Sequence, residues 1–149
     1  MSLQQQVMDA MKIAMKTKDT QALEALRAVK SALLIAQTAT GSKEEISEDE
    51  ELKILQKQVK QRKDSAAIYT EQGRADLAEP ELIQAAVIEQ FLPKQLSEEE
   101  VAKVVDAIIA ETGATSMKDM GQVMGMANGK LAGKADGKTI STIVKNRLG

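Results

Sequence analysis

The chain has 149 residues, of which 43% are hydrophobic and 28% are charged, and its formal net charge is −2. It contains no histidine and no cysteine, which excludes Ser-His-Asp and Cys-His catalysis, disulfides and thiolate metal sites. Aromatic residues make up only 1% of the sequence. Because strand-rich folds depend on aromatic and β-branched residues, this composition favours an all-α protein.

Apolar residues recur at three- and four-residue spacing along the first part of the chain, which predicts helices. The first three are expected over about 3–15, 20–38 and 48–71, with a break at Gly41 and Ser42 between the second and the third. Ser47 and Glu50 form a capping-box pattern at the start of the third helix, and Gly73 is placed to end it.

A fourth helix is expected with Pro80 in its first turn, because the first turn of a helix does not use the N–H that proline lacks. Its apolar side is expected to contain Leu82, Ile83, Ala86, Val87 and Phe91. Pro93 cannot continue this helix, so we place a domain boundary between about residues 92 and 96. The sequence thus predicts a two-lobed protein with an N-terminal four-helix lobe over 1–92 and a C-terminal lobe over 93–149.

Three further helices are expected in the C-terminal lobe. Ser97 and Glu100 form a second capping box, and Gly113 is placed to end the helix that follows. Ser116 and Asp119 are expected to open the next helix. A loop at 133–137 then leads to a last helix, which either Asp136 or Thr139 is expected to cap.

Positive charge is concentrated in two parts of the chain. From residue 112 onward there are six basic residues against two acidic ones, a net charge of +4. The candidate contacts to RNA phosphates in this part are Lys118, Lys130, Lys134, Lys138, Lys145 and Arg147. In the N-terminal lobe they are Lys57, Lys60, Arg62 and Lys63. A basic stripe of this kind supplies salt-dependent affinity for a nucleic-acid backbone, and the lack of aromatics disfavours base stacking.

The alternative for the N-terminal lysines is a solvated helix face that pairs with nearby acids, for example Asp49 with Lys53. Arg62 interrupts the apolar stripe of the third helix. We expect its aliphatic stem to lie along the edge of the core and its guanidinium group to remain in water.

Residues 133–139, with the sequence GKADGKT, imitate a phosphate-binding loop. A nucleotide-binding loop of that type needs four residues between its glycines and a preceding strand, whereas Gly133 and Gly137 enclose three residues and no strand is expected. We therefore expect no nucleotide and no other cofactor. The free N–H groups at the start of the last helix, beside Lys134 and Lys138, remain a place to meet an RNA phosphate.

Glycines recur every four residues from Gly121 to Gly137. On a helix, Gly121 and Gly125 share one side, where small residues allow another helix to approach closely, and we favour this packing role over a direct contact with a ligand. The methionines between residues 117 and 126 are expected in the core, although flexible methionines also suit an adaptable contact surface.

The segments that carry these motifs resemble one known family. Residues 113–125 (GATSMKDMGQVMG) and 133–137 (GKADG) are similar to the signature of the GatB/YqeY family, and the segments 60–65 and 91–97 resemble stand-alone YqeY proteins. The structural residues of this motif are Asp119, Gly121, Gly125, Gly133, Asp136 and Gly137. Gly129 departs from the pattern, since the family often has proline there.

The resemblance implies an all-helical, two-lobed fold related to the tail of the B subunit of the glutamine-dependent tRNA amidotransferase, a carbon–nitrogen ligase. In that enzyme the tail contacts tRNA, and a separate domain performs the chemistry. We therefore expect an accessory, cytoplasmic module that binds tRNA or another RNA, with no catalytic residue, no metal, no membrane association and no DNA specificity.

Two other hypotheses remain open. One is a protein–protein adaptor that uses the surface of residues 117–129 to dock on an amidotransferase or on the translation machinery. The other is a genuine amidotransferase component. An RNA-dependent interaction favours RNA binding by the basic residues, whereas an interaction that survives nuclease treatment favours an adaptor.

Overall fold

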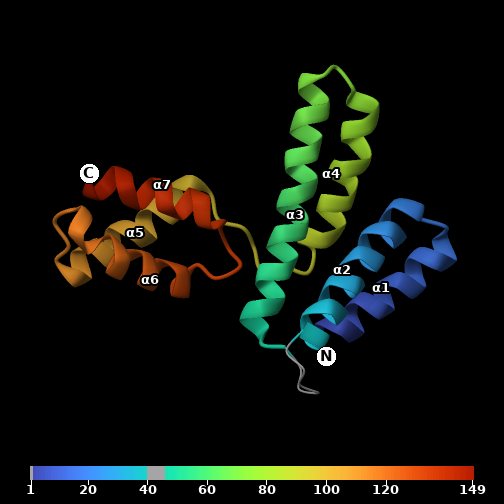
Figure 1. Cartoon of the computed structure of the whole chain (residues 1–149), viewed down its shortest axis with the longest axis horizontal. Coiled ribbons are helices and arrows are strands. Elements are labelled where there is room, and N and C mark those ends of the chain that lie inside the picture. The colour runs from blue at the N-terminus through green and yellow to red at the C-terminus, as the bar shows by residue number, and fades with distance from the viewer. Residues whose placement is uncertain (1, 40–45) are drawn as a thin grey trace. The chain divides into compact units, whose positions relative to one another are not determined.

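The computed structural model describes residues 2–39 and 46–149, and within them the chain forms helices and turns but no strand (Figure 1). The predicted all-α class is thereby confirmed. The α-helices are α1 (Leu3–Thr17), α2 (Thr20–Ala39), α3 (Glu48–Glu71), α4 (Ala75–Glu89), α5 (Glu98–Thr112), α6 (Met120–Lys130) and α7 (Gly137–Leu148), and a short 3-10 turn, η1 (Met117–Asp119), precedes α6. The break expected at Gly41 and Ser42 lies outside the described residues.

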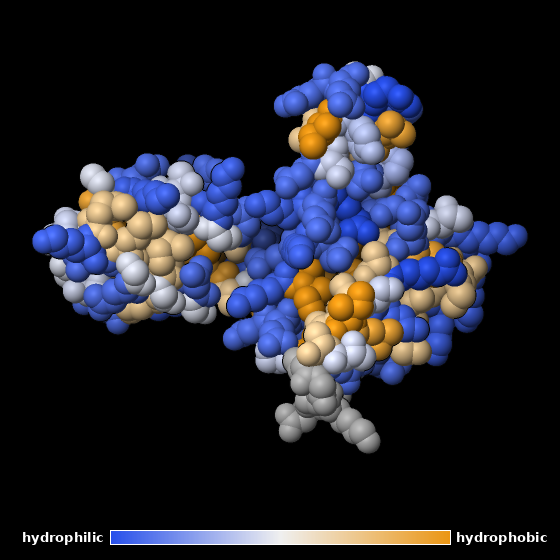
Figure 2. Space-filling model, viewed as in Figure 1, coloured by the Kyte–Doolittle hydropathy of each residue, from blue (hydrophilic) through white to orange (hydrophobic). Residues whose placement is uncertain are grey.

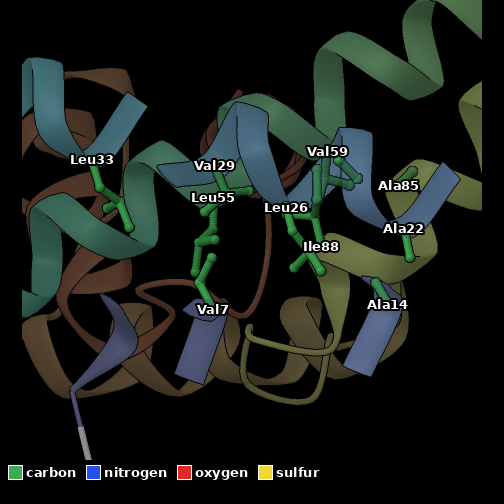
Figure 3. Close-up of a cluster of buried hydrophobic side chains, with 11 residues drawn as sticks. Val7, Ala14, Ala22, Leu26, Val29, Leu33, Leu55, Val59, Ala85 and Ile88 are labelled. Atoms are coloured by element: carbon green, nitrogen blue, oxygen red, sulfur yellow. The ribbon is translucent and has the colours of Figure 1, made fainter. Parts of the chain in front are cut away.

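The chain divides into two compact units, Met1–Leu92 and Pro93–Gly149. In the first unit, α2 lies at the centre and contacts α1, α3 and α4. Its buried face contains Ala22, Ala25, Leu26, Val29 and Leu33. Figure 3 shows side chains from α1, α3 and α4 converging on this face. The small alanines let the neighbouring helices approach α2 closely, so a core without buried aromatic rings still packs densely.

The end of α3 was predicted correctly. The Gly73 N–H donates to the Thr70 carbonyl (3.1 Å), and the Arg74 N–H donates to the Tyr69 carbonyl (2.8 Å). These two bonds form a Schellman motif, which satisfies the last carbonyl groups of α3 and reverses the chain. Helix α4 therefore begins almost at once, and α3 and α4 form a long hairpin (Figure 1).

The predicted start of α4 was wrong, because the helix begins at Ala75 and Pro80 lies inside it. The first turn is closed before the proline, since the Arg74 carbonyl accepts from both the Leu77 and Ala78 N–H groups (3.1 Å each). The Arg74 guanidinium also bonds the Asp76 carboxylate (3.0 Å) and lowers the pKa of that carboxyl group. Helix α4 continues past Pro80 because it packs on α3 and α2, which compensates for the one backbone bond that the proline removes.

The predicted apolar side of α4 was wrong for three of its five residues. Leu82 and Ile83 are 50% and 42% exposed, and Ala86 is exposed as well, whereas Val87 and Phe91, which follows the end of the helix, pack against the core. The residues of α4 that are buried are Ala78, Gln84, Ala85 and Ile88. Apolar residues surround this helix on every side, so their spacing does not reveal which side faces the core. Hydrophobic residues accordingly reach the surface of the first unit over α1 and α2 and at the tip of the α3–α4 hairpin (Figure 2).

A polar network joins three helices of the first unit. The Arg62 Nε on α3 donates to the Gln84 side chain on α4 (3.0 Å), and the Gln84 amide donates to Gln21 on α2 (2.8 Å). Arg62 also donates to the carbonyl and the side chain of Gln58. The expectation that the Arg62 guanidinium would remain in water was therefore wrong, because Gln84, which is 7% exposed, needs a partner inside the fold.

In the second unit, α5, α6 and α7 contact one another pairwise. Each contributes branched side chains to one core, among them Val101, Val105, Ile108, Val123, Ile140 and Val144. The capping box of Ser97 and Glu100 is complete, and Gly113 ends α5 with a left-handed backbone (φ +69°), both as predicted.

We expect Gln84→Ala to lower the free energy of unfolding by about 1–3 kcal/mol, because it removes the hydrogen bonds to the charged Arg62 and to Gln21 and leaves these half-buried groups without that partner. Urea unfolding followed by circular dichroism measures this change. The matched control is Gln90→Ala, a truncation of an exposed glutamine at the end of the same helix, which should change the stability by less than about 0.5 kcal/mol. Equal stabilities of the two variants would contradict the role given to the network.

Candidate nucleic-acid interface

The loop that leads into α7 is held by hydrogen bonds from the segment before α5. The Leu96 N–H donates to the Lys134 carbonyl (2.9 Å), and the Gln95 side chain donates to the Gly133 carbonyl (2.6 Å). Gly133 itself is buried and has a left-handed backbone (φ +74°), a conformation that glycine adopts without strain. The backbone of this loop is thus fixed while the Lys134 side chain extends into solvent.

The start of α7 is fixed by the predicted cap. The Asp136 carboxylate accepts from the Thr139 N–H (2.7 Å), and the Asp136 carbonyl accepts from the Ile140 N–H (3.2 Å). Lys138 lies in the first turn of α7, two residues after the cap, and its side chain is exposed. Lys134 and Lys138 therefore flank a well-defined helix start, at which the Asp136 carboxylate already accepts the Thr139 N–H.

The turn before α6 places a third lysine. The Ser116 hydroxyl accepts from the Lys118 N–H (3.4 Å), and the Asp119 carboxylate accepts from the Thr115 N–H (3.0 Å). Ser116 is the N-cap of the 3-10 turn, as its predicted role requires. The Asp119 side chain makes no capping bond to α6 and instead bonds back to Thr115. These bonds fix the backbone around Lys118, which is exposed.

Charge within the second unit is strongly polarised. Helix α5 contains five acidic residues and one basic residue, a net charge of −4, whereas residues 112–149 have a net charge of +4. The basic residues that follow α5 are therefore the groups of this unit that attract a polyanion, whereas the acidic residues of α5 repel one. The near-neutral total for the unit conceals this division.

The six candidate cations of the second unit differ in how free they are. Lys130 lies 3.6 Å from Glu111, and Arg147 donates to Asp106 (2.8 Å). Arg147 also borders a hollow of about 220 Å³ that includes Glu98 and Glu99, which makes it the least suited to phosphate. Within the described chain, no ion pair involves the remaining four, namely Lys118, Lys134, Lys138 and Lys145.

The candidate cations of the first unit also separate into two kinds. Lys63 pairs with Glu89 on α4, and Arg62 belongs to the polar network with Gln84. Both side chains therefore join α3 to α4. Lys57 and Lys60 are exposed on α3, and neither they nor Lys53 takes part in an ion pair among the described residues. The alternative pairing of Asp49 with Lys53 is thus not formed.

The packing role predicted for the glycines of α6 was wrong. A Cβ atom placed on Gly121, Gly125 or Gly129 would meet no atom within 4 Å, and these three glycines are exposed. No described helix of the unit approaches this side of α6, because the core is formed by Val123 and Ala127 on the opposite side. The helix also continues through Gly129 to Lys130.

Sequence patterns did not indicate the contacts of Gln95 and Leu96, or the network around Gln84. Glutamine has no positional preference of the kind that reveals a cap, so spacing does not identify these residues. In the described part of the chain, no three acidic residues cluster in a way that could hold a metal ion. No described helix is long and apolar enough to cross a membrane. What the arrangement offers chemically is a set of exposed ammonium groups on a fixed backbone.

The comparison with protein families decides the relationship. The model of the family described as Yqey-like protein matches residues 4–148. The chain belongs to the Yqey-like family. The resemblance expected from the motifs at 113–125 and 133–137 is thereby confirmed.

Relatives of this Yqey-like chain include amidotransferase subunits. Over 73 residues the chain is 40% identical to the E subunit of the glutamyl-tRNA(Gln) amidotransferase of Thermococcus gammatolerans, which covers 46% of this chain and 12% of that relative. The corresponding protein of Aeropyrum pernix is 38% identical over 65 residues, which covers 41% of this chain and 10% of the relative. The match therefore spans only about a tenth of the length of these relatives.

The open side of α6 leads to a prediction about stability. We expect Gly125→Ala to stabilise the second unit by about 0.5–1 kcal/mol, because alanine favours helix and its Cβ meets no neighbour. The control is Gly113→Ala at the left-handed end of α5, which should destabilise by about 1–2 kcal/mol. Thermal or urea unfolding measures both changes. Destabilisation by Gly125→Ala would show that α6 is packed on this side after all.

Proposed function

We propose that this Yqey-like protein is an accessory module that binds the backbone of tRNA, acts in the cytoplasm and performs no bond-making step of its own. The observation that carries the proposal is the polarised second unit. In it, α5 is acidic, whereas four lysines in η1, α7 and the loop before α7 form no ion pair among the described residues. The relatives named as glutamyl-tRNA(Gln) amidotransferase subunits make tRNA the polyanion of choice.

The mode of binding follows from the side chains present. Lysine ammonium groups bind phosphate as point charges and carry no sequence information. The chain has only one tyrosine and one phenylalanine, and both lie in the first unit, so the second unit has no ring on which a base can stack. Affinity should therefore depend on the shape and charge of the RNA.

Salt dependence tests the proposal directly. If Lys118, Lys134, Lys138 and Lys145 each contact one phosphate, the logarithm of the tRNA association constant should fall against the logarithm of salt concentration with a slope of about −3 to −4. Fluorescence anisotropy of labelled tRNA at several salt concentrations measures this slope. Binding that does not respond to ionic strength, or no binding at low salt, would exclude the proposal.

The double variant Lys134→Gln/Lys138→Gln should make that slope shallower by about 2. The matched control is Lys103→Gln, which removes the one positive charge of α5, on the acidic side of the same unit. It should leave the slope within about 0.5 of the parent value. If both variants changed the slope equally, binding would depend on total charge and not on the α6–α7 side.

A second candidate function is an adaptor that docks on an amidotransferase or another translation protein through residues 117–129. The exposed glycine side of α6 and the 46% exposed Met117 favour it. Co-sedimentation with a purified amidotransferase after nuclease treatment separates the two functions. An interaction that persists without RNA, together with no affinity for tRNA, would replace the first proposal by the second.

A further inference from the structure

The first unit has an apolar groove that its own helices leave open. Helices α1 and α4 both pack on α2, and the groove bordered by these three helices has a volume of about 540 Å³. Its floor contains the buried Ala14, Ala22 and Leu26, and its walls carry Ile13 on α1 and Ile83 on α4. Groove size and apolar lining are those of a binding site.

The walls of this groove are more exposed than apolar residues of a self-sufficient fold need to be. Ile13 is 63% exposed and Ile83 is 42% exposed, and Leu82, beside Ile83 on α4, is 50% exposed. Helix α4 has apolar residues on the side that faces α2 and α3 and also on the other side, where no described helix covers Leu82 and Ile83. An exposed apolar surface of this kind marks a contact with another molecule.

Charge on the two walls is opposite in sign. Helix α4 contains four acidic residues and no basic one, and of these Asp76 and Glu89 pair with Arg74 and Lys63 while Glu79 and Glu81 form no ion pair among the described residues. Helix α1 contains Lys12 and Lys16 against Asp9, and Asp19, which caps α2, lines the groove after α1. Lys16 lies one turn after Ile13, and Glu79 lies one turn before Ile83, so each charge is next to the isoleucine of its wall. Both charged side chains are on exposed residues without an ion pair among the described residues.

This combination points to one occupant. A twofold contact places the α1 wall of one copy against the α4 wall of the other, twice, so opposite charges meet at both places. Two α4 helices brought together would instead repel each other. We propose that the groove is the interface of a homodimer, in which Ile13 packs against the partner's Ile83 and Lys16 lies beside the partner's Glu79. The proposal concerns the first unit and does not depend on RNA binding.

Sedimentation equilibrium of the full chain, freed of nucleic acid by nuclease, tests the interface. We expect a concentration-dependent dimer and expect Ile13→Asp to raise its dissociation constant at least about tenfold, because a charge enters the apolar centre. The matched control is Ile35→Asp on α2, since Ile35 is 67% exposed but does not line the groove. Circular dichroism establishes that both variants are folded. A monomer at every concentration, or equal effects of both substitutions, would overturn the proposal, whatever else covers the groove.

A charge exchange gives a second and more specific readout. At low salt, Lys16→Glu alone and Glu79→Lys alone should each weaken the homodimer by about three- to tenfold, because like charges then meet at two places. An equimolar mixture of the two variants should form a mixed dimer in which opposite charges meet at both contacts. The affinity of this mixed dimer should therefore exceed that of either variant for itself. A mixture that associates no better than either variant alone would rule out this pairing of α1 with α4.

Discussion

The hydrogen bonds that close the helix ends are the interaction on which the rest of this structure depends. Ser97 starts α5, Asp136 starts α7, and the bonds from Gln95 and Leu96 hold the loop between α6 and α7. Because these bonds fix the backbone, the Cα atoms of lysines such as Lys134 and Lys138 have defined positions although their side chains are long and flexible. A binding surface made only of charge needs such fixed origins, since the side chains themselves have no preferred geometry.

These helix ends are also what the sequence predicted best. Ser97, Gly113 and Asp136 act within a few residues of their own position, so a short pattern is sufficient to identify them. The prediction failed where the deciding contact is distant in sequence. The side of α4 that faces the core is selected by α2 and α3, and the partner of Arg62 is a glutamine 22 residues away. The prediction for the glycines of α6 was wrong for a different reason. A helix was expected to pack on them, whereas no neighbouring atom of the described chain comes within 4 Å of a Cβ placed there.

The sequence identified the candidate basic residues, but it could not tell which of them pair with other residues of the chain and which do not. Composition and charge pattern identify all ten cations, whereas only the fold separates Lys134 and Lys138, which form no ion pair in the described chain, from Lys63 and Arg62, which join α3 to α4. A basic residue has the same appearance in a sequence whether it binds a partner or stabilises its own chain. The names of the relatives suggest tRNA only as the proposed ligand, while the division of roles among the lysines comes from their neighbours.

The separation of charge between α5 and the rest of the second unit has a consequence for the approach of a ligand. Residues 93–149 contain eight basic and seven acidic side chains, so the unit has almost no net charge although α5 is acidic and the residues after it are basic. At distances beyond the Debye length of roughly 8 Å at physiological salt, such a unit attracts a polyanion only weakly. For the proposed binding, the local positive charge of the lysines that the described residues leave unpaired therefore matters at close range, and the net charge of the unit does not.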